Sequence, residues 1–308
     1  MRSPDRRGFA LVAVLWILVL GSALALEVHA GVRADQRAAA NARAEARARW
    51  AARGALARAE DALRAKLAAQ SAAGAPPGTD TLLVPALHYV LDEVEIRARV
   101  LDARSRVQLN LAGPEALREV FTAAGIPAER ARGMAAAIVR WRLTNAPPFV
   151  PAVRTDAADE VLALPPRGAF GAVEGLRRVP GIGGGEYLRV APYLTVASDG
   201  RINLNTAPVP VLRTLPGMSP AAAEAVVRRR RAAPFLGPYE VADALPRHAR
   251  GRLRDEMAGF LAAVAFAPAQ AELVADAAPR GSPVRARIRA VAAMGGAGKY
   301  VIVNVVER

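Results

Sequence analysis

An uncharged apolar run near the start of the chain constrains its fold more than any other feature. Residues 9–26 carry no charged side chain, and Arg2, Arg6 and Arg7 precede them. A helix over this run would be about 27 Å long, close to the hydrocarbon thickness of a bilayer. Because Lys and Arg on a short flank stay in the cytoplasm, the run predicts one membrane span, with the remaining chain on the far side.

Two interpretations of this run stay open. A cleavable secretory signal normally has a shorter apolar region that ends in a small-x-small site. Residues 22–25 offer such a site, Ser-Ala-Leu-Ala, although the apolar run is longer than a signal usually needs. The other interpretation is that the run is retained as an anchor.

The segment after the run continues the helix. Residues 27–70 are rich in Ala, Arg and Glu, which are strong helix formers, and contain no Pro. We therefore expect one helix over residues 9–70, ending where Gly and Pro gather between 71 and 80. Four large apolar residues fall near helical spacing and predict one buried stripe: Trp50, Leu56, Leu63 and Leu67.

Strand-like segments flank a long middle block. Residues 82–91 and 94–101 are apolar or alternate with charges, and residues 284–291 and 300–306 are similar. The expected fold class is α+β. The long helix would pack on a small antiparallel sheet formed by residues 80–104 and 271–308. A large all-α domain, residues 105–270, would be inserted into that sheet.

The inserted block contains a repeated phrase. Residues 107–112 (VQLNLA) and 202–207 (INLNTA) each precede two helices, at 114–123 and 128–141 and at 208–214 and 220–231. This predicts two helix-hairpin-helix-like repeats and an internal duplication. Asn205 and Thr206 are expected to cap N–H groups of the following helix. A third, related turn lies at residues 179–183.

The junction between the basic leader and the apolar run resembles a processing site. Gly8-Phe9 is similar to the cleavage site of type IV prepilins and type II secretion pseudopilins. The resemblance implies that residues 1–8 are a leader removed by prepilin peptidase, and that Phe9 becomes the methylated N-terminus. Most of these proteins carry Glu at the fifth mature position. Here it is Ala13, which resembles the minor pseudopilin K family of type II secretion.

Five further stretches match that family in order: residues 137–142, 162–166, 173–176, 192–196 and 202–207. The resemblance implies a non-enzymatic pseudopilus subunit in the bacterial inner membrane, with its N-terminus cytoplasmic and its globular part periplasmic. Its expected partners are minor pseudopilins I and J and other pseudopilus subunits. The expected place is the fibre tip, where it would initiate or cap the pseudopilus and support protein export.

The family also implies calcium as a cofactor. Asp156, Asp159 and Glu160 are in register with its second acidic cluster, whereas Leu143 and Asn145 stand where it usually has Asp. Because Ca²⁺ takes six to eight oxygen ligands, both a residual calcium site and a bare loop remain open. With three His and no Cys, a His/Cys metal centre is not expected, and no motif of a catalytic site is present.

A DNA receptor is the alternative function. Residues 202–245 resemble the DNA-binding domain of the competence receptor, which also has one membrane helix, and the net charge is +14. In such hairpins, turn N–H groups bind a phosphate. The turn at 179–183 keeps two glycines, whereas the turn at 215–219 keeps only the first. Since Arg is dispersed and residues 228–231 lie away from the turn, we expect no specific nucleic acid.

Overall fold

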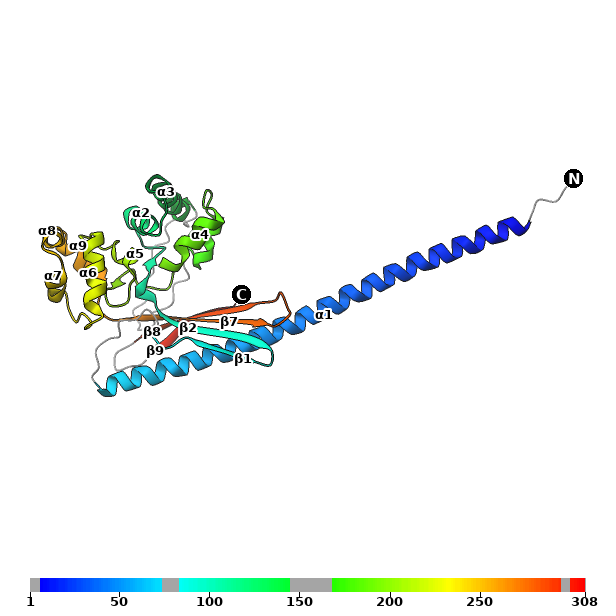
Figure 1. The fold of residues 1–308 in the computed structure, drawn as a ribbon, viewed down its shortest axis with the longest axis horizontal. Coiled ribbons are helices and arrows are strands. Elements are labelled where there is room, and N and C mark those ends of the chain that lie inside the picture. The colour runs from blue at the N-terminus through cyan, green and yellow to red at the C-terminus, as the bar shows by residue number, and fades with distance from the viewer. Residues whose placement is uncertain (1–5, 74–82, 145–167, 295–299, 308) are drawn as a thin grey trace, which may run out of the picture.

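The computed structural model describes residues 6–73, 83–144, 168–294 and 300–307 of the chain. One helix, α1, covers Arg6–Ala73 and includes the whole of the expected helix of residues 9–70. Figure 1 shows that its first half projects alone, away from the rest of the molecule. Its second half lies along the sheet. The fold is α+β, with an antiparallel sheet and a large helical part, as the sequence predicted.

The main sheet has five antiparallel strands in the order β1-β2-β7-β8-β9. Their bounds are Leu87–Leu91, Val94–Asp102, Gln270–Pro279, Ala286–Met294 and Tyr300–Glu307. Sequence patterns did not resolve β7 as a strand, because its sequence QAELVADAAP has several strong helix formers. Its central place between β2 and β8 decides its conformation, since pairing on both sides outweighs local propensity.

Helix α1 packs on the sheet through small residues. Its buried stripe consists of Ala48, Ala52, Ala55, Ala59, Leu63 and Leu67. Facing sheet residues include Ile96, Val100, Leu273 and Ile288. The prediction that Trp50 belongs to this stripe is wrong, because Trp50 lies on the opposite side of α1 and is 69% exposed. Alanines let the helix approach the strands closely, and an indole would not fit between them.

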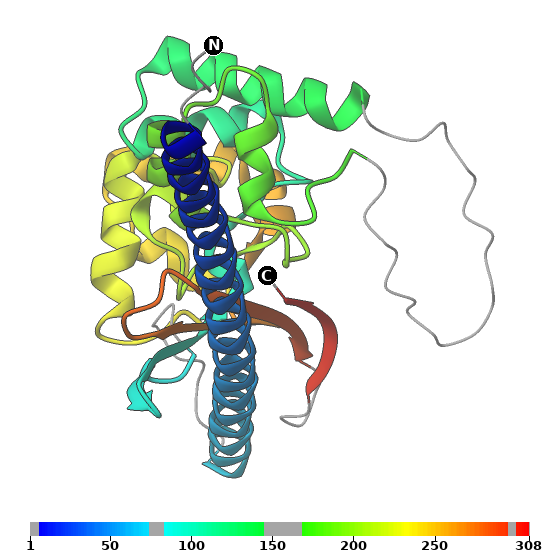
Figure 2. The ribbon, with the colours of Figure 1, turned by 90° about the vertical axis from the view of Figure 1, so that its right-hand side faces the viewer.

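The segment between β2 and β7 forms a helical insert with a hydrophobic core of its own. Its helices are α2 (Pro114–Ala123), α3 (Ala128–Thr144), α4 (Gly184–Val190), α5 (Val209–Leu212), α6 (Pro220–Arg230), α7 (Tyr239–Ala244), α8 (Arg247–Asp255) and α9 (Met257–Ala263). Short 3₁₀ helices cover Ala103–Ser105, Val173–Arg178 and Ala191–Tyr193. The insert lies above the sheet in Figure 1, and α1 lies below it; Figure 2 shows α1 crossing in front of the strands.

The expectation that the insert is all-α needs a correction. It contains two short parallel strand pairs, β3 (Val107–Gln108) with β4 (Leu194–Thr195) and β5 (Ile202–Asn203) with β6 (Val264–Ala265). β3 and β5 are the first residues of the two repeated phrases. Their partners arrive from about 60–90 residues later in the chain, so no local pattern could have indicated the pairing.

Candidate functional site

The two halves of the insert, residues 107–195 and 202–265, are closed by the same pair of hydrogen bonds. In the first half, Asn110 Oδ1 accepts from the backbone N–H of Phe170 at 2.7 Å, and Asn110 Nδ2 donates to the Phe170 carbonyl at 3.0 Å. In the second half, Asn205 bonds to both backbone groups of Phe235, at 2.8 and 2.9 Å. Each Asn thus ties its phrase to the segment that follows the hairpin.

An arginine completes each half. Arg142, near the end of α3, donates to the carbonyls of Leu109 and Ala112 at 3.1 and 2.8 Å. Arg230, the last residue of α6, donates to the carbonyls of Leu204 and Ala207 at 2.8 and 2.7 Å.

The hydrogen bonds beside the short strands also correspond. The N–H of Leu109 donates to the Thr195 carbonyl at 2.8 Å, and the N–H of Leu204 donates to the Ala265 carbonyl at the same distance. The halves therefore repeat one set of contacts, which supports the predicted duplication; the duplication itself stays a prediction.

The capping role expected for Asn205 and Thr206 is wrong. Asn205 Nδ2 donates to the carbonyls of Phe235 and Phe266, and Thr206 Oγ1 donates to the Asp102 carboxylate at 2.6 Å. The N-cap position of α5 is Pro208, which provides no side-chain cap. Both polar side chains are buried, so they are held by tertiary partners instead of by the adjacent helix end.

In the glycine turn at residues 179–183, a backbone N–H group is already bonded to a carboxylate of the protein itself. The Gly183 N–H donates to Glu186 Oε2 at 2.8 Å, and Arg130 donates to the same carboxylate at 2.7 Å. The hydrogen bond from Arg130 and the one from Gly183 lower the pKa of Glu186 to about 2. In a DNA-binding hairpin, this N–H group would bind a phosphate. Here a carboxylate fills that place and would repel one.

The turn of the second hairpin, residues 215–219, packs against a neighbouring helix. Gly217 has a φ of +72°, and an added Cβ would lie 2.8 Å from Cα of Leu253 in α8. The turn therefore presses against another helix. Of the basic run at the end of α6, Arg230 holds two carbonyls and Arg229 stacks 5.5 Å from the Phe235 ring centroid. These contacts favour internal packing over phosphate binding.

A buried carboxylate joins the sheet to the insert. Asp102, the last residue of β2, is fully buried. It accepts hydrogen bonds from Arg104 N at 2.9 Å, Asn203 Nδ2 at 2.7 Å and Thr206 Oγ1 at 2.6 Å. Burial raises its pKa, although the bonds from Thr206 and Asn203 partly oppose the rise. The second repeated phrase is thereby attached to the end of a sheet strand.

Ion pairs around this junction extend the attachment. Arg104 pairs with Asp199, and Arg106 pairs with Glu272 of β7 at 2.6 Å. On β8, Arg289 pairs with Glu174 of the insert. Sequence reasoning found none of these residues, since each is an ordinary charged position whose partner lies tens of residues away.

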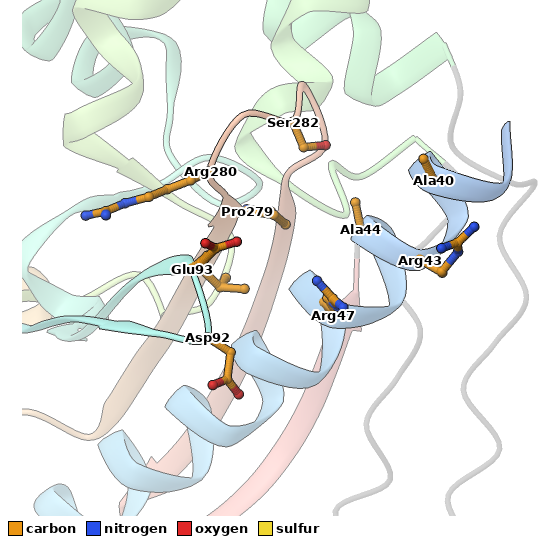
Figure 3. Close-up of a pocket in the computed structure, with 10 residues that line it drawn as sticks. Ala40, Arg43, Ala44, Arg47, Asp92, Glu93, Pro279, Arg280 and Ser282 are labelled. Carbon is orange, nitrogen blue, oxygen red and sulfur yellow. The ribbon is translucent and has the colours of Figure 1, made fainter. Parts of the chain in front are cut away.

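A cleft opens where the sheet ends beside α1. Figure 3 shows its lining, with α1 on one side and the β1–β2 and β7–β8 turns on the other. Its volume is about 230 Å³. Residues from α1 are Ala40, Arg43, Ala44 and Arg47, and the turns contribute Asp92, Glu93, Val94, Pro279, Arg280 and Ser282. The lining thus combines both signs of charge around two alanines.

Most of the site residues predicted from the sequence lie outside the described part of the structure. Asp156, Asp159 and Glu160 belong to the undescribed residues 145–167, and at Gly8-Phe9 the structure describes the helical backbone alone. Within the described residues, no three His, Cys, Asp or Glu side chains gather as metal ligands would. The side chains of residues 6–13 of α1 are outside the description, and over the remaining described residues no helix has the length and apolarity that a membrane span requires.

Comparison with known proteins gives two findings. The family model for type II secretion system protein K matches residues 202–251. One chain in the crystal structure of the GspK-GspI-GspJ complex, from the Type 2 Secretion System of enterotoxigenic Escherichia coli, has a similar fold. Its TM-score is 0.54 at 17% identity, and the match covers 85% of this chain and 96% of that chain. No curated protein is significantly similar in sequence. The resemblance to protein K inferred from the sequence is therefore confirmed.

Proposed function

We propose that the chain is a minor pseudopilin of the K type, a structural subunit of the type II secretion machine. The observation that carries the proposal is the architecture: a long helix, α1, and an antiparallel sheet that is interrupted between β2 and β7 by an insert with its own core. Similarity to the fold in the GspK-GspI-GspJ complex extends over 85% of the chain, so it includes more than the residues of the family match.

The N-terminal segment is the proposed anchor. Residues 1–8 would be removed by prepilin peptidase, and residues 9–26 would hold the protein in the inner membrane with its globular part in the periplasm. Support comes from the uncharged run and its basic flank. The exposed side chains of Val14–Leu20 on a single projecting helix give further support, because a large apolar patch marks a membrane or a protein partner.

Minor pseudopilins I and J are the proposed partners at the tip of the fibre. Shaft subunits need the Glu at the fifth mature position, since a buried N-terminal amine without a carboxylate is costly. Ala13 cannot supply that carboxylate, and a subunit at the tip has no further neighbour that would need it. The insert adds bulk that would obstruct a subunit stacked above, so we infer that this subunit initiates or caps the fibre.

Copy number and partner binding test this proposal together. In sheared fibres, quantitative mass spectrometry should find far fewer copies of this chain than of the major pseudopilin. The full-length chain should also copurify with minor pseudopilins I and J of the same system. Near-equal copy numbers, or no association with I and J, would contradict the proposal.

Nucleic acid is not part of the proposed function. The backbone N–H of Gly183 is already bonded to Glu186, and the turn at Gly217 is packed against α8. We expect the weak, salt-sensitive association that any basic surface shows, with a Kd of about 10⁻⁴–10⁻⁶ M. Submicromolar DNA binding at physiological salt would favour the competence-type receptor instead.

A further inference from the structure

Between the apolar run and the sheet, residues 27–49 of α1 separate their charges onto two faces. With 3.6 residues per turn, four arginines fall within about 120° of the helix circumference. These are Arg33, Arg37, Arg43 and Arg47. The acidic residues of the stretch lie on the other side, and they are Glu27, Asp35 and Glu45. The remaining arginine, Arg49, belongs to the acidic side and pairs with Glu45 at 2.5 Å. We call the four arginines the basic face.

The basic face has no partner within the described chain. All four side chains are exposed, and none forms an ion pair with a residue that the structure describes. Arg43 and Arg47 lie where α1 meets the sheet, and they line the cleft in Figure 3. Arg33 and Arg37 are one turn apart on the part of α1 that projects beyond the sheet in Figure 1. This pair is therefore available to an anion from outside the chain.

The pair lies just beyond the end of the proposed anchor. The apolar run ends at Leu26, so Arg33 and Arg37 follow about 10 and about 16 Å further along the helix. The headgroup layer of a bilayer is about 5–8 Å thick. Helical side chains lean toward the N-terminus, and long Arg side chains extend toward the lipid–water interface. Both guanidinium groups therefore reach back toward the lipid phosphates, whereas Arg43 and Arg47 lie about 26 and about 32 Å along the helix, beyond that reach.

The distribution of charge along the sequence gives this pair special weight. Between Phe9 and Arg33 the sequence contains no Arg or Lys. Removal of residues 1–8, as proposed above, also removes the arginines of the leader, so Arg33 and Arg37 become the basic side chains nearest the bilayer. A guanidinium group binds phosphate oxygens through paired, charge-assisted hydrogen bonds. Glu27 is closer to the bilayer, but it belongs to the acidic side of α1 and does not oppose a phosphate on the basic face.

We propose that Arg33 and Arg37 bind the phosphate groups of anionic phospholipids in the periplasmic leaflet. The contact sets how deep α1 lies in the membrane before the subunit enters the fibre. Because attraction acts on one face and the acids lie on the other, it also sets the direction in which the helix tilts. The proposal rests on the proposed function, since only an anchored chain brings this pair to a bilayer.

A lipid titration followed by native mass spectrometry tests the proposal. The probe is phosphatidylglycerol, added to the full-length chain after purification from membranes in a neutral detergent. Wild type should bind it more tightly than phosphatidylcholine with the same acyl chains. The double variant Arg33→Gln, Arg37→Gln should weaken phosphatidylglycerol binding about tenfold or more. Inorganic phosphate at millimolar concentration should not displace the lipid, and full displacement would identify a general anion site and overturn the inference.

A matched control uses the other two arginines of the basic face. Arg43→Gln with Arg47→Gln removes the same charge from the same side of α1, and it should leave the lipid affinity unchanged. Because all four side chains are exposed and unpaired in the described structure, both double variants should keep the wild-type melting temperature.

The outcomes separate this inference from the proposed function. The inference is overturned if the Arg33, Arg37 variant binds phosphatidylglycerol as wild type does, or if the Arg43, Arg47 variant loses as much affinity. In either case the proposed function stands when the wild-type chain resists carbonate extraction from membranes and copurifies with minor pseudopilins I and J. A wild-type chain that carbonate releases and that binds neither I nor J would overturn both.

Discussion

Asp102 is the residue on which the junction between sheet and insert depends. Its carboxylate accepts three hydrogen bonds at 0% exposure, and two of the donors belong to the second repeated phrase. The Arg104 guanidinium, which could have neutralised it, pairs with Asp199 instead. The charge is thus held mainly by neutral donors, which bond to both carboxylate oxygens.

Asp102→Asn should lower the free energy of unfolding by about 1–3 kcal/mol, because the amide N–H₂ would face the Asn203 and Thr206 donors. The difference in the free energy of unfolding between wild type and the Asn variant should depend on pH. Burial raises the pKa of Asp102, so wild type loses stability as the pH rises from 3.8 through the raised pKa, whereas the Asn variant does not. Urea titrations from about pH 4 to pH 7 should show that the difference in the free energy of unfolding between wild type and Asp102→Asn becomes smaller toward neutral pH. Asp199→Asn, whose carboxylate is 33% exposed, should cost less.

Glu186 shows the opposite pH dependence. Its pKa is lowered to about 2, so its stabilising contribution is complete above 4.5 and is lost as the pH falls from 4.5 toward 2. Glu186→Gln should flatten the loss of stability between about pH 5 and pH 2, measured by denaturant midpoint. Glu115→Gln is the control, since that carboxylate is 79% exposed beside Arg118. If the denaturant midpoints of wild type and Glu186→Gln fell equally between about pH 5 and pH 2, the expectation would be contradicted.

At the scale of elements, the insert is two copies of one arrangement with unequal burial. Asn205 is fully buried and holds three backbone groups. Asn110 is half-buried and holds two. Asn205→Ala should lower the free energy of unfolding by about 2–4 kcal/mol, and Asn110→Ala by about 1–2 kcal/mol, since water can replace part of the exposed contact. Hydrogen exchange of the Phe235 and Phe170 amides should report each loss separately. Equal effects would argue against burial as the cause.

Helix α1 offers a sharper contrast between two neighbouring positions. Ala52 is fully buried against the sheet, so Ala52→Leu should cost about 1–3 kcal/mol through overpacking. Trp50 faces away, and Trp50→Ala should change stability by less than about 0.5 kcal/mol although it removes a far larger side chain. Chemical denaturation of both variants measures the contrast. The reverse order would mean that the helix is rotated on the sheet.

For the whole molecule, the proposed topology depends on what happens to its first residues. Gly8→Val should block processing, because a β-branched side chain would crowd the subsite of the peptidase. Intact-mass analysis should find the wild-type chain beginning at a methylated Phe9 and the variant retaining residues 1–8. Gly21→Val, a change inside the apolar run, should be processed normally. A wild-type chain that begins near residue 26 would instead indicate a secretory signal.

Much of this architecture follows from the sequence alone. The long helix needed only the absence of Pro and the abundance of Ala, Arg and Glu. The bounds of α2, Pro114–Ala123, agree with its prediction because Pro marks a first helical turn and Gly125 a C-terminal one. These signals are local: each depends on residues within one or two turns, and local preferences survive in the folded chain when no tertiary contact opposes them.

Tertiary structure decided the features that depend on distant partners. Strand β7 exists because β2 and β8 pair with it on both sides. The side chains of Asn205 and Thr206 do not cap the following helix, because they bond to buried partners instead. These partners are the carbonyls of Phe235 and Phe266 and the carboxylate of Asp102. Periodicity indicated the contact face of α1 correctly at Leu63 and Leu67, which are buried, and at Leu56, which packs against the same core, but it wrongly included Trp50. A Trp and an alanine stripe both follow helical spacing, and only the close approach of helix and strands selects the alanines.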